Sequence, residues 1–150
     1  MSNAIVIRNS IFIAASPEDV WDFTQDYGKR PTWDASVKRA EIIENSPVLK
    51  VKIWGNDGSK LIFEYKLQER PSRTTLSMEV EQSRFFEKGG GSWTYESVER
   101  GTLWTQINSV QLRNDWWLQI LKPMIEWMLK TGTRKAMQKA MKLIENQAKN

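Results

Sequence analysis

From Val37 to Leu112 the sequence repeats short stretches in which apolar and polar residues alternate, and no helical pattern separates these stretches. Turns rich in Gly, Pro, Asn and Asp divide them at 45–47, 55–58, 70–72 and 100–101. The apolar positions of the expected strands are Leu49, Val51, Ile53, Leu61, Phe63, Tyr65, Leu67, Leu76, Met78, Val80, Trp93 and Tyr95. Successive strands without helices between them predict an antiparallel meander.

Helical patterns flank this meander. Residues 5–13 alternate with period two and predict a first strand, after which Ser16 is a good N-cap for a short helix with Pro17 at its first position. Residues 31–34 predict a second short helix. A long helix is expected over 115–146, with an apolar stripe at helical spacing. The stripe consists of Leu118, Leu121, Ile125, Leu129, Gly132, Ala136, Ala140 and Leu143.

Glycine and proline predict three local departures from regular structure. Pro123 should kink or interrupt the long helix. Thr131-Gly132-Thr133 is a second weak point in the same helix. Gly89-Gly90-Gly91 predicts a flexible link between strands, and it lacks the lysine, hydroxyl residue and helix that would make it a phosphate-binding loop.

The order of these elements predicts the fold class. A half-buried sheet must cover its apolar face, and the C-terminal helix is the only element long enough to do so. We therefore expect an α+β fold in which a curved antiparallel β-sheet wraps around a long C-terminal α-helix, with two short helices after the first strand. The length predicts a single domain over residues 1–150.

The sequence contains neither cysteine nor histidine. Their absence excludes disulfides, thiolate metal sites and imidazole-based catalysis, including the usual Ser-His-Asp triad. A catalyst would have to use carboxylates, Tyr, Lys, Arg or bound water. The glutamates on the outward phase of the strands are Glu64, Glu79, Glu81 and Glu96. We therefore identify no catalytic residue and expect no metal and no cofactor.

A bent sheet closed by one helix leaves a space that is typical of a ligand site. The helix is small at Gly132 and Ala136, opposite bulky strand residues, which predicts either a cavity or a closely packed helix. Tyr65 and Tyr95 lie on the inward phase, where they serve as polar groups of a cavity or as core residues whose hydroxyls reach water. The predicted cavity lining is Trp33, Phe63, Tyr65, Met78, Trp93, Tyr95, Leu121, Ile125, Met128, Gly132 and Ala136.

The formal net charge of +4 is concentrated in the final helix. The cations there are Arg134, Lys135, Lys139, Lys142 and Lys149. A basic helix end can contact nucleic acid or anionic lipid. A solvated outer face is the simpler interpretation, because core residues are interspersed among the cations along the helix. We therefore expect no nucleic-acid partner.

The first residues, 1–4, lack the charged and apolar regions of a signal peptide, which predicts a cytoplasmic protein. The most apolar stretch, 116–129, is interrupted by polar residues and is shorter than the about 20 residues of a membrane span. No stable membrane insertion is expected. The oligomeric state, monomer or dimer, stays open.

Residues 11–23, Ile-Phe-Ile-Ala-Ala-Ser-Pro-Glu-Asp-Val-Trp-Asp-Phe, resemble the opening of START-like (SRPBCC) proteins of the polyketide cyclase/dehydrase-related group. Residues 31–33 resemble the short second helix of that superfamily and 100–105 its late Gly-Thr hairpin, so the resemblance covers almost the whole chain. It implies a helix-grip fold. The superfamily includes cyclases, lipid carriers, hormone receptors and co-chaperone domains, and its shared pattern implies no catalytic residues.

Three functions are compatible with these observations, and the state of the cavity distinguishes them. The first is binding or transport of a small apolar molecule, of an aromatic, polyketide or lipid-like kind, in a roomy and dry cavity. The second is a polyketide cyclase/dehydrase-type enzyme that uses Tyr or Arg and ordered water, which needs convergent polar groups. The third is a co-chaperone-like interaction module with a collapsed cavity and an external apolar patch around an exposed Trp54.

Overall fold

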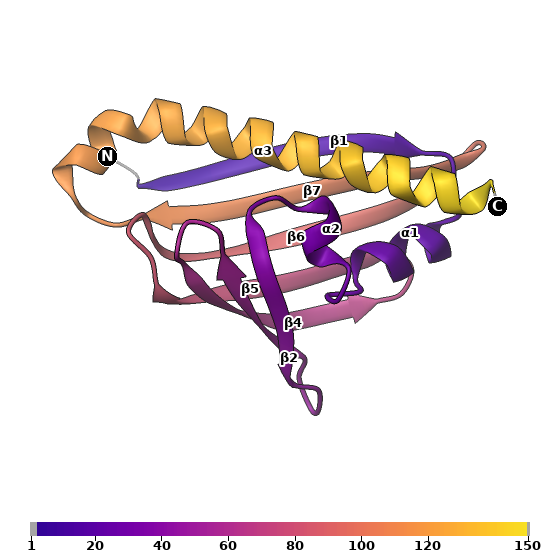
Figure 1. Ribbon diagram of the computed structural model, residues 1–150, viewed down its shortest axis with the longest axis horizontal. Helices are drawn as coiled ribbons and strands as arrows, with labels where there is room; N and C mark the ends of the chain where they lie inside the picture. The colour runs from indigo at the N-terminus through magenta and orange to yellow at the C-terminus, as the bar shows by residue number, and fades with distance from the viewer. Residues whose placement is uncertain (1–2, 150) are drawn as a thin grey trace.

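The computed structural model describes residues 3–149. The strands are β1 (Ala4–Ile13), β2 (Val37–Glu44), β3 (Lys50–Gly55), β4 (Lys60–Glu69), β5 (Arg73–Gln82), β6 (Phe86–Val98) and β7 (Gly101–Leu112). The helices are α1 (Pro17–Thr24), α2 (Arg30–Trp33) and α3 (Trp116–Ala148). In the described part of the chain the strands form one antiparallel sheet in the order β1-β7-β6-β5-β4-β3-β2, and α3 lies along its curved inner side (Figure 1). The predicted α+β helix-grip fold is confirmed.

Local sequence explains how the chain begins. In β1, Ile5 and Ile13 are buried whereas Val6 is exposed, as a period-two pattern predicts. The first helix starts where the sequence places it, because Oγ of Ser16 accepts a hydrogen bond from the backbone N–H of Asp19 at 3.2 Å. A proline follows at the first helical position, where its missing N–H has no intrahelical partner to lose.

The long helix α3 runs from Trp116 to Ala148 without a break, so the interruption expected at Pro123 does not occur. A proline inside a helix is unfavourable by about 3 kcal/mol. Here Leu118 and Ile125, on either side of the proline, are buried in the same apolar cluster. Packing of this apolar face keeps the helix continuous, as tertiary contacts supply most helical stability in proteins. The weak point expected around Gly132 is likewise continuous helix.

The inward stripe of α3 packs on the sheet in two clusters. The first half of the helix packs with β1 and β7 through Leu118, Ile125, Ile5, Ile7 and Leu112. The second half contributes Ala136, Met137, Ala140 and Ile144 to a cluster that includes Trp33, Trp93 and Trp104. A third cluster contains Tyr27, Val37, Val51, Ile53 and Tyr65, and none of its described members comes from α3. The core is therefore divided, and α3 contributes side chains to the first two clusters but not to the third.

The widths of the elements explain this division. Neighbouring strands lie about 4.8 Å apart, so seven of them span roughly 29 Å of arc. An α-helix with its side chains is only about 10–12 Å wide. Because α3 packs against β1 at one edge of the sheet, it cannot also fill the space in front of β4 and β5. Curvature of the sheet brings these strands around that space without closing it.

The three glycines 89–91 lie inside β6, paired with β5 on one side and β7 on the other. The expectation of a flexible link is therefore wrong. These positions show no apolar alternation because they carry no side chains. The sheet needs glycine there, since a Cβ on Gly89 would come within 2.6 Å of the backbone oxygen of Ser109, and one on Gly90 within 2.9 Å of that of Leu76.

The expectation of an exposed Trp54 is also wrong, because the residue is half-buried. The guanidinium carbon of Arg39 lies 4.0 Å from the centre of its ring, and Nζ of Lys52 lies 5.0 Å from it. These cation–π contacts cover the indole with polar groups. Position 54 therefore does not present an open apolar patch.

Candidate functional site

A cavity of about 430 Å³ lies between the middle of α3 and the inner face of β4–β7. Its apolar lining is Trp33, Phe63, Leu76, Met78, Trp93, Val110, Met128, Leu129 and Ala136. The volume falls in the range of about 300–1,000 Å³ that small-molecule sites occupy. A Cβ added at Gly132 would have no atom within 4 Å, so this turn of the helix faces open space.

The cavity opens between α3 and the segment that joins α2 to β2. The exposed residues of its lining come from these two elements. They are Met128, Gly132, Lys135 and Lys139 from α3, and Ala35 and Ser36 from the joining segment. The entrance therefore combines apolar and cationic groups, whereas the strands form the deeper wall.

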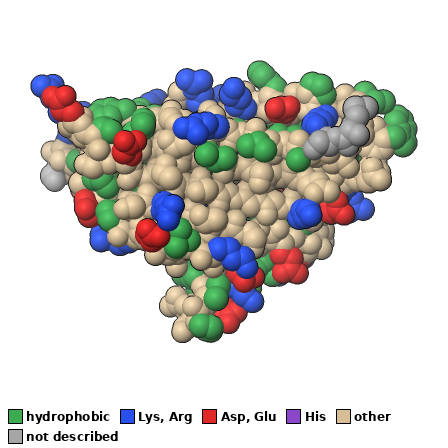
Figure 2. Space-filling view, turned by 180° about the vertical axis from the view of Figure 1, so that it is seen from behind, with side chains coloured by type: hydrophobic (Ala, Val, Ile, Leu, Met, Phe, Trp, Pro, Cys, Tyr) green, Lys and Arg blue, Asp and Glu red, His purple; other side chains and the backbone are tan. Residues whose placement is uncertain are grey.

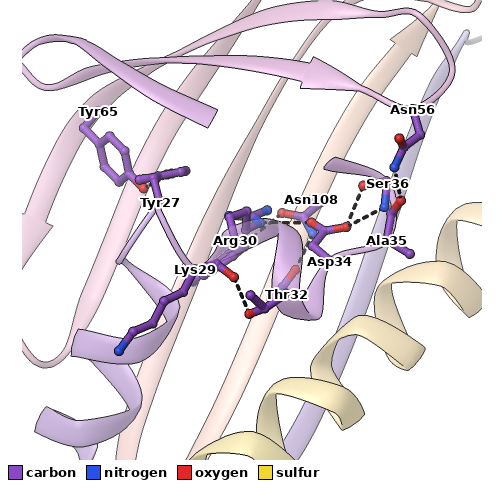
Figure 3. Close-up of polar contacts among 12 residues, drawn as sticks. Tyr27, Lys29, Arg30, Thr32, Asp34, Ala35, Ser36, Asn56, Tyr65 and Asn108 are labelled. Atoms are coloured by element: carbon purple, nitrogen blue, oxygen red, sulfur yellow. Dashed lines mark hydrogen bonds and ion pairs between the residues drawn. The ribbon is translucent and has the colours of Figure 1, made fainter. Parts of the chain in front are cut away.

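An ion pair lies on the inner wall of the cavity. Nε of Arg30 donates to Oδ2 of Asp34 at 2.9 Å, and both side chains are largely buried. The other carboxylate oxygen of Asp34 accepts hydrogen bonds from the backbone N–H and the hydroxyl of Ser36, at 3.1 and 2.6 Å. The i, i+4 spacing at the single turn of α2 brings the two charged groups together (Figure 3).

Both members of this pair keep their charge at neutral pH. Burial alone would raise the pKa of Asp34, but the charge of Arg30 and the hydrogen bonds from Ser36 outweigh burial, and the pKa is lowered. Burial also opposes the charge of Arg30, but Asp34 and the nearby tyrosines outweigh it and raise the pKa of the guanidinium. Within the described residues, no three acidic, histidine or cysteine side chains lie together as a metal site requires.

Aromatic rings surround the guanidinium of Arg30. Its central carbon lies 4.7 Å from the ring centre of Trp33, 5.0 Å from that of Trp93 and 5.8 Å from that of Tyr27. Each such contact stabilises a buried cation by about 0.5–2 kcal/mol. The rings therefore hold a planar hydrogen-bond donor in a fixed position on a mostly apolar wall.

Asn108 of β7 lies beside Arg30 (Figure 3) and is held by two hydrogen bonds. Its Oδ1 accepts from Nε1 of Trp93 at 3.1 Å, and its Nδ2 donates to Oε1 of Gln106 at 2.8 Å. All three of these residues line the cavity. The network fixes the orientation of the Trp93 ring, so this part of the wall is ordered by contacts within the protein.

A second polar network runs from the cavity wall into the core. Tyr65 donates its proton to Oε1 of Gln25 at 2.8 Å, so the hydrogen bond between Tyr27 and Tyr65 has Tyr27 as its donor. Nε2 of Gln25 donates to the hydroxyl of Tyr95 at 2.9 Å. Tyr95 in turn hydrogen-bonds Thr24 at 2.7 Å, and the proton of Thr24 goes to a backbone carbonyl. Each tyrosine proton is thus engaged inside the protein.

Burial raises the pKa of all three tyrosines above the ordinary value. The pKa of Tyr65 is raised most clearly, because the neighbouring Tyr27 hydroxyl adds to the effect of burial. These hydroxyls are therefore neutral at physiological pH. They act as structural hydrogen-bond partners, and none is suited to remove a proton there.

Eight of the eleven residues of the predicted lining lie on the cavity wall, namely Trp33, Phe63, Tyr65, Met78, Trp93, Met128, Gly132 and Ala136. The other three lie elsewhere. The ring of Tyr95 packs in the core against Trp21 and Trp104. Leu121 and Ile125 pack in the cluster beneath the first half of α3. The helix lies close to β1 along that half, so open space begins only near Met128.

The predicted lining lacks most polar residues of the wall, and those that matter for the site are Arg30, Asp34, Gln106 and Asn108. Two of them could be found by alternation, since β7 turns its even positions inward from Trp104 to Leu112. The arginine and the aspartate carry the i, i+4 spacing of a helical ion pair. A helix of four residues has too little periodicity to show which side faces inward.

Residues 4–146 match the family described as "Polyketide cyclase / dehydrase and lipid transport". No curated protein sequence matches the chain. Its structure is similar to that of the protein TTHA0849 from Thermus thermophilus, with a TM-score of 0.78 and 13% identity over 93% of this chain and 96% of that one.

Two further solved structures share the fold. The Zhui aromatase/cyclase from Streptomyces sp. R1128 has a TM-score of 0.80 at 12% identity, covering 97% and 96% of the two chains. A conserved protein from Geobacillus kaustophilus has a TM-score of 0.77 at 18% identity, covering 95% and 96%. At these identities the likeness shows the fold alone. The sequence match over residues 4–146 shows that the chain belongs to the polyketide cyclase/dehydrase and lipid transport family.

Proposed function

We propose that the protein binds a small, mostly apolar molecule that carries an oxygen-containing polar group. The apolar part occupies the cavity, and the oxygen lies next to Arg30 and Asn108. The observation that carries this proposal is an apolar cavity with a positioned guanidinium on its inner wall. Sites of this kind gain affinity from apolar contact and orientation from a few polar groups.

The donor chemistry of Arg30 supports an oxygen ligand. A guanidinium has five N–H donors in one plane, and the ion pair with Asp34 uses the one at Nε. Other N–H groups of the same side chain suit a carbonyl, phenol or carboxylate oxygen. Burial of the apolar part would contribute roughly 25 cal/mol for each Å² removed from water.

The ionisation of the cavity groups favours binding over catalysis. General acid–base catalysis works best when the pKa lies near the operating pH. The pKa of Asp34 is lowered and those of the tyrosines are raised, which moves all of them away from neutrality. A cyclase-type reaction is the second candidate, because the Zhui aromatase/cyclase has a similar structure. It would depend on holding a flexible substrate in a reactive shape beside Arg30.

An interaction module centred on Trp54 has less support. The cations of Arg39 and Lys52 cover that ring, and the cavity is open rather than collapsed.

Native mass spectrometry of the protein purified from its own host tests the proposal. We expect one co-purifying apolar molecule per chain and, after its removal, saturable binding of a neutral fluorescent probe such as Nile red. A chemically altered molecule after incubation would favour the cyclase candidate. Absence of both a bound molecule and probe binding would overturn the proposal.

A further inference from the structure

The outer face of the first half of α3 carries large exposed apolar side chains. Trp116, Ile120 and Trp127 are 76%, 69% and 67% exposed. Met124 and Met128 beside them are about half exposed. We call these five residues the outer stripe. Apolar side chains of this size are normally buried, so a contiguous exposed set marks an interaction surface.

Helical spacing places the outer stripe on one side of α3. Trp116, Ile120 and Met124 follow at intervals of four residues, and Trp127 and Met128 lie three and four residues after Met124, opposite the buried Leu118 and Ile125. The core already has its own stripe, so the outer stripe is not required for packing within the chain. Figure 2 shows hydrophobic side chains along the upper right rim, where the first half of α3 runs.

The same helix is strongly basic. It contains Lys122, Lys130, Arg134, Lys135, Lys139 and Lys142, against the two acidic residues Glu126 and Glu145. By helical spacing, Arg134, Lys135 and Lys142 continue the side on which the outer stripe lies, and all three are exposed. The outer face is therefore apolar in its first half and cationic in its second half.

We propose that the outer stripe docks on the surface of an anionic lipid bilayer. Tryptophan favours the boundary between the headgroups and the acyl chains. A helix with an apolar face and neighbouring cations lies in the plane of that boundary. Each Lys or Arg near an anionic surface adds about 1 kcal/mol of attraction. Within residues 3–149, no helix is both long enough and apolar enough to cross a membrane.

The position of the outer stripe beside the cavity entrance also favours a lipid surface. Met128 belongs to the outer stripe and to the cavity lining, and Lys135 lies at the entrance. A docked helix would hold the entrance near the bilayer. A second copy of the chain is a poorer occupant, because the cations of the two α3 helices would repel each other. Docking goes beyond the proposed function, since it can be measured without a ligand.

Co-sedimentation of the full chain with lipid vesicles tests docking. We expect binding to vesicles of phosphatidylcholine with one quarter phosphatidylglycerol, and much weaker binding to pure phosphatidylcholine. The variant Trp116→Ser/Trp127→Ser is expected to bind anionic vesicles about tenfold more weakly or worse. The variant Arg134→Gln/Lys142→Gln should lose a similar factor, because it removes two cations.

The control is Ile42→Ser/Ile43→Ser, which removes two apolar side chains of β2 that are about half exposed. It should bind like the wild type, and melting curves should show that all variants fold. Failure of the wild type to bind anionic vesicles would overturn the proposal, as would an equal loss in the control. Analytical ultracentrifugation gives a further decisive outcome. A wild-type dimer that the tryptophan variant dissociates would overturn docking and assign the outer stripe to self-association.

Discussion

Nε of Arg30 and Oδ2 of Asp34 lie 2.9 Å apart on the inner wall of a mostly apolar cavity. The pair brings a cation into a place where an isolated charge would be strongly unfavourable. The rings of Trp33 and Trp93 hold that cation from two sides. The cavity is therefore a mostly apolar space in which the protein holds a polar group in a fixed position. The following predictions depend on this arrangement.

Breaking the pair from one side should destabilise the fold strongly. Arg30→Met leaves the carboxylate of Asp34 buried without its partner, which we expect to lower the free energy of unfolding by about 3–5 kcal/mol. Arg30→Met/Asp34→Asn should recover most of this loss, because no charge remains and the amide oxygen can still accept from Ser36. Urea unfolding of the three proteins measures both effects. Equal losses in the single and double variants would show that the two groups are not coupled.

The pair should also make stability depend on pH in acid. The pKa of Asp34 is lower in the folded protein than in the unfolded chain, where it is about 3.9. Its contribution is therefore present above the unfolded value and is lost as the pH falls through the folded value. Below about pH 4, Asp34→Asn should lose less stability per pH unit than the wild type. Parallel slopes in urea unfolding would contradict this role.

The three tyrosines should not ionise in the folded protein at their ordinary pKa of about 10. The sequence has no others, and burial raises the pKa of each. Since only the unfolded chain releases these protons near pH 10, stability should fall as the pH rises above that value toward the folded pKa values. Absorbance of tyrosinate near 295 nm should therefore appear together with loss of structure. A reversible ionisation near pH 10 with the circular dichroism unchanged would be incompatible with the buried network.

Tyr95 should matter for stability and not for binding. Tyr95→Phe removes the hydroxyl that Thr24 and Gln25 bind, at a cost of about 1–3 kcal/mol. Because the residue lies outside the cavity lining, the dissociation constant of Nile red should stay within a factor of about two of the wild-type value. A large loss of probe affinity in a folded variant would place the binding site elsewhere.

The fold could be predicted from sequence because its signals are repetitive. Alternation from Leu49 to Tyr65 and from Leu76 to Val80 indicates the inward side of β3, β4 and β5, although a register shift after Tyr65 turns Leu67 to the other face. The stripe of α3 has enough turns to define its buried side. The glycines 89–91 give no such signal, since a residue without a side chain does not indicate which face of the sheet is buried. At Pro123 the local signal is misleading, because packing of the helix outweighs the preference of proline against helix.

The cavity could be predicted only in outline. Small residues at Gly132 and Ala136 opposite bulky strand residues indicate a space, but the sequence does not show how closely α3 approaches β1. The distance between α3 and β1 determines that Leu121 packs in the core, whereas Met128 lines the cavity. The ion pair of Arg30 and Asp34 depends on α2, whose single turn carries no periodic signal.

Whether the space in front of Gly132 receives a ligand is decided by titrating Nile red into the wild type and into Gly132→Leu. We expect saturable binding to the wild type. The leucine should weaken it by about tenfold or more, because its side chain enters space that is empty within 4 Å of an added Cβ. The melting temperature should hold or rise, since glycine inside a helix is unfavourable by about 1 kcal/mol. Gly132→Ala, the control, should be more stable than the wild type and keep its probe affinity. A lower melting temperature for Gly132→Leu, with probe binding unchanged or absent from the wild type, would contradict a ligand cavity at this position.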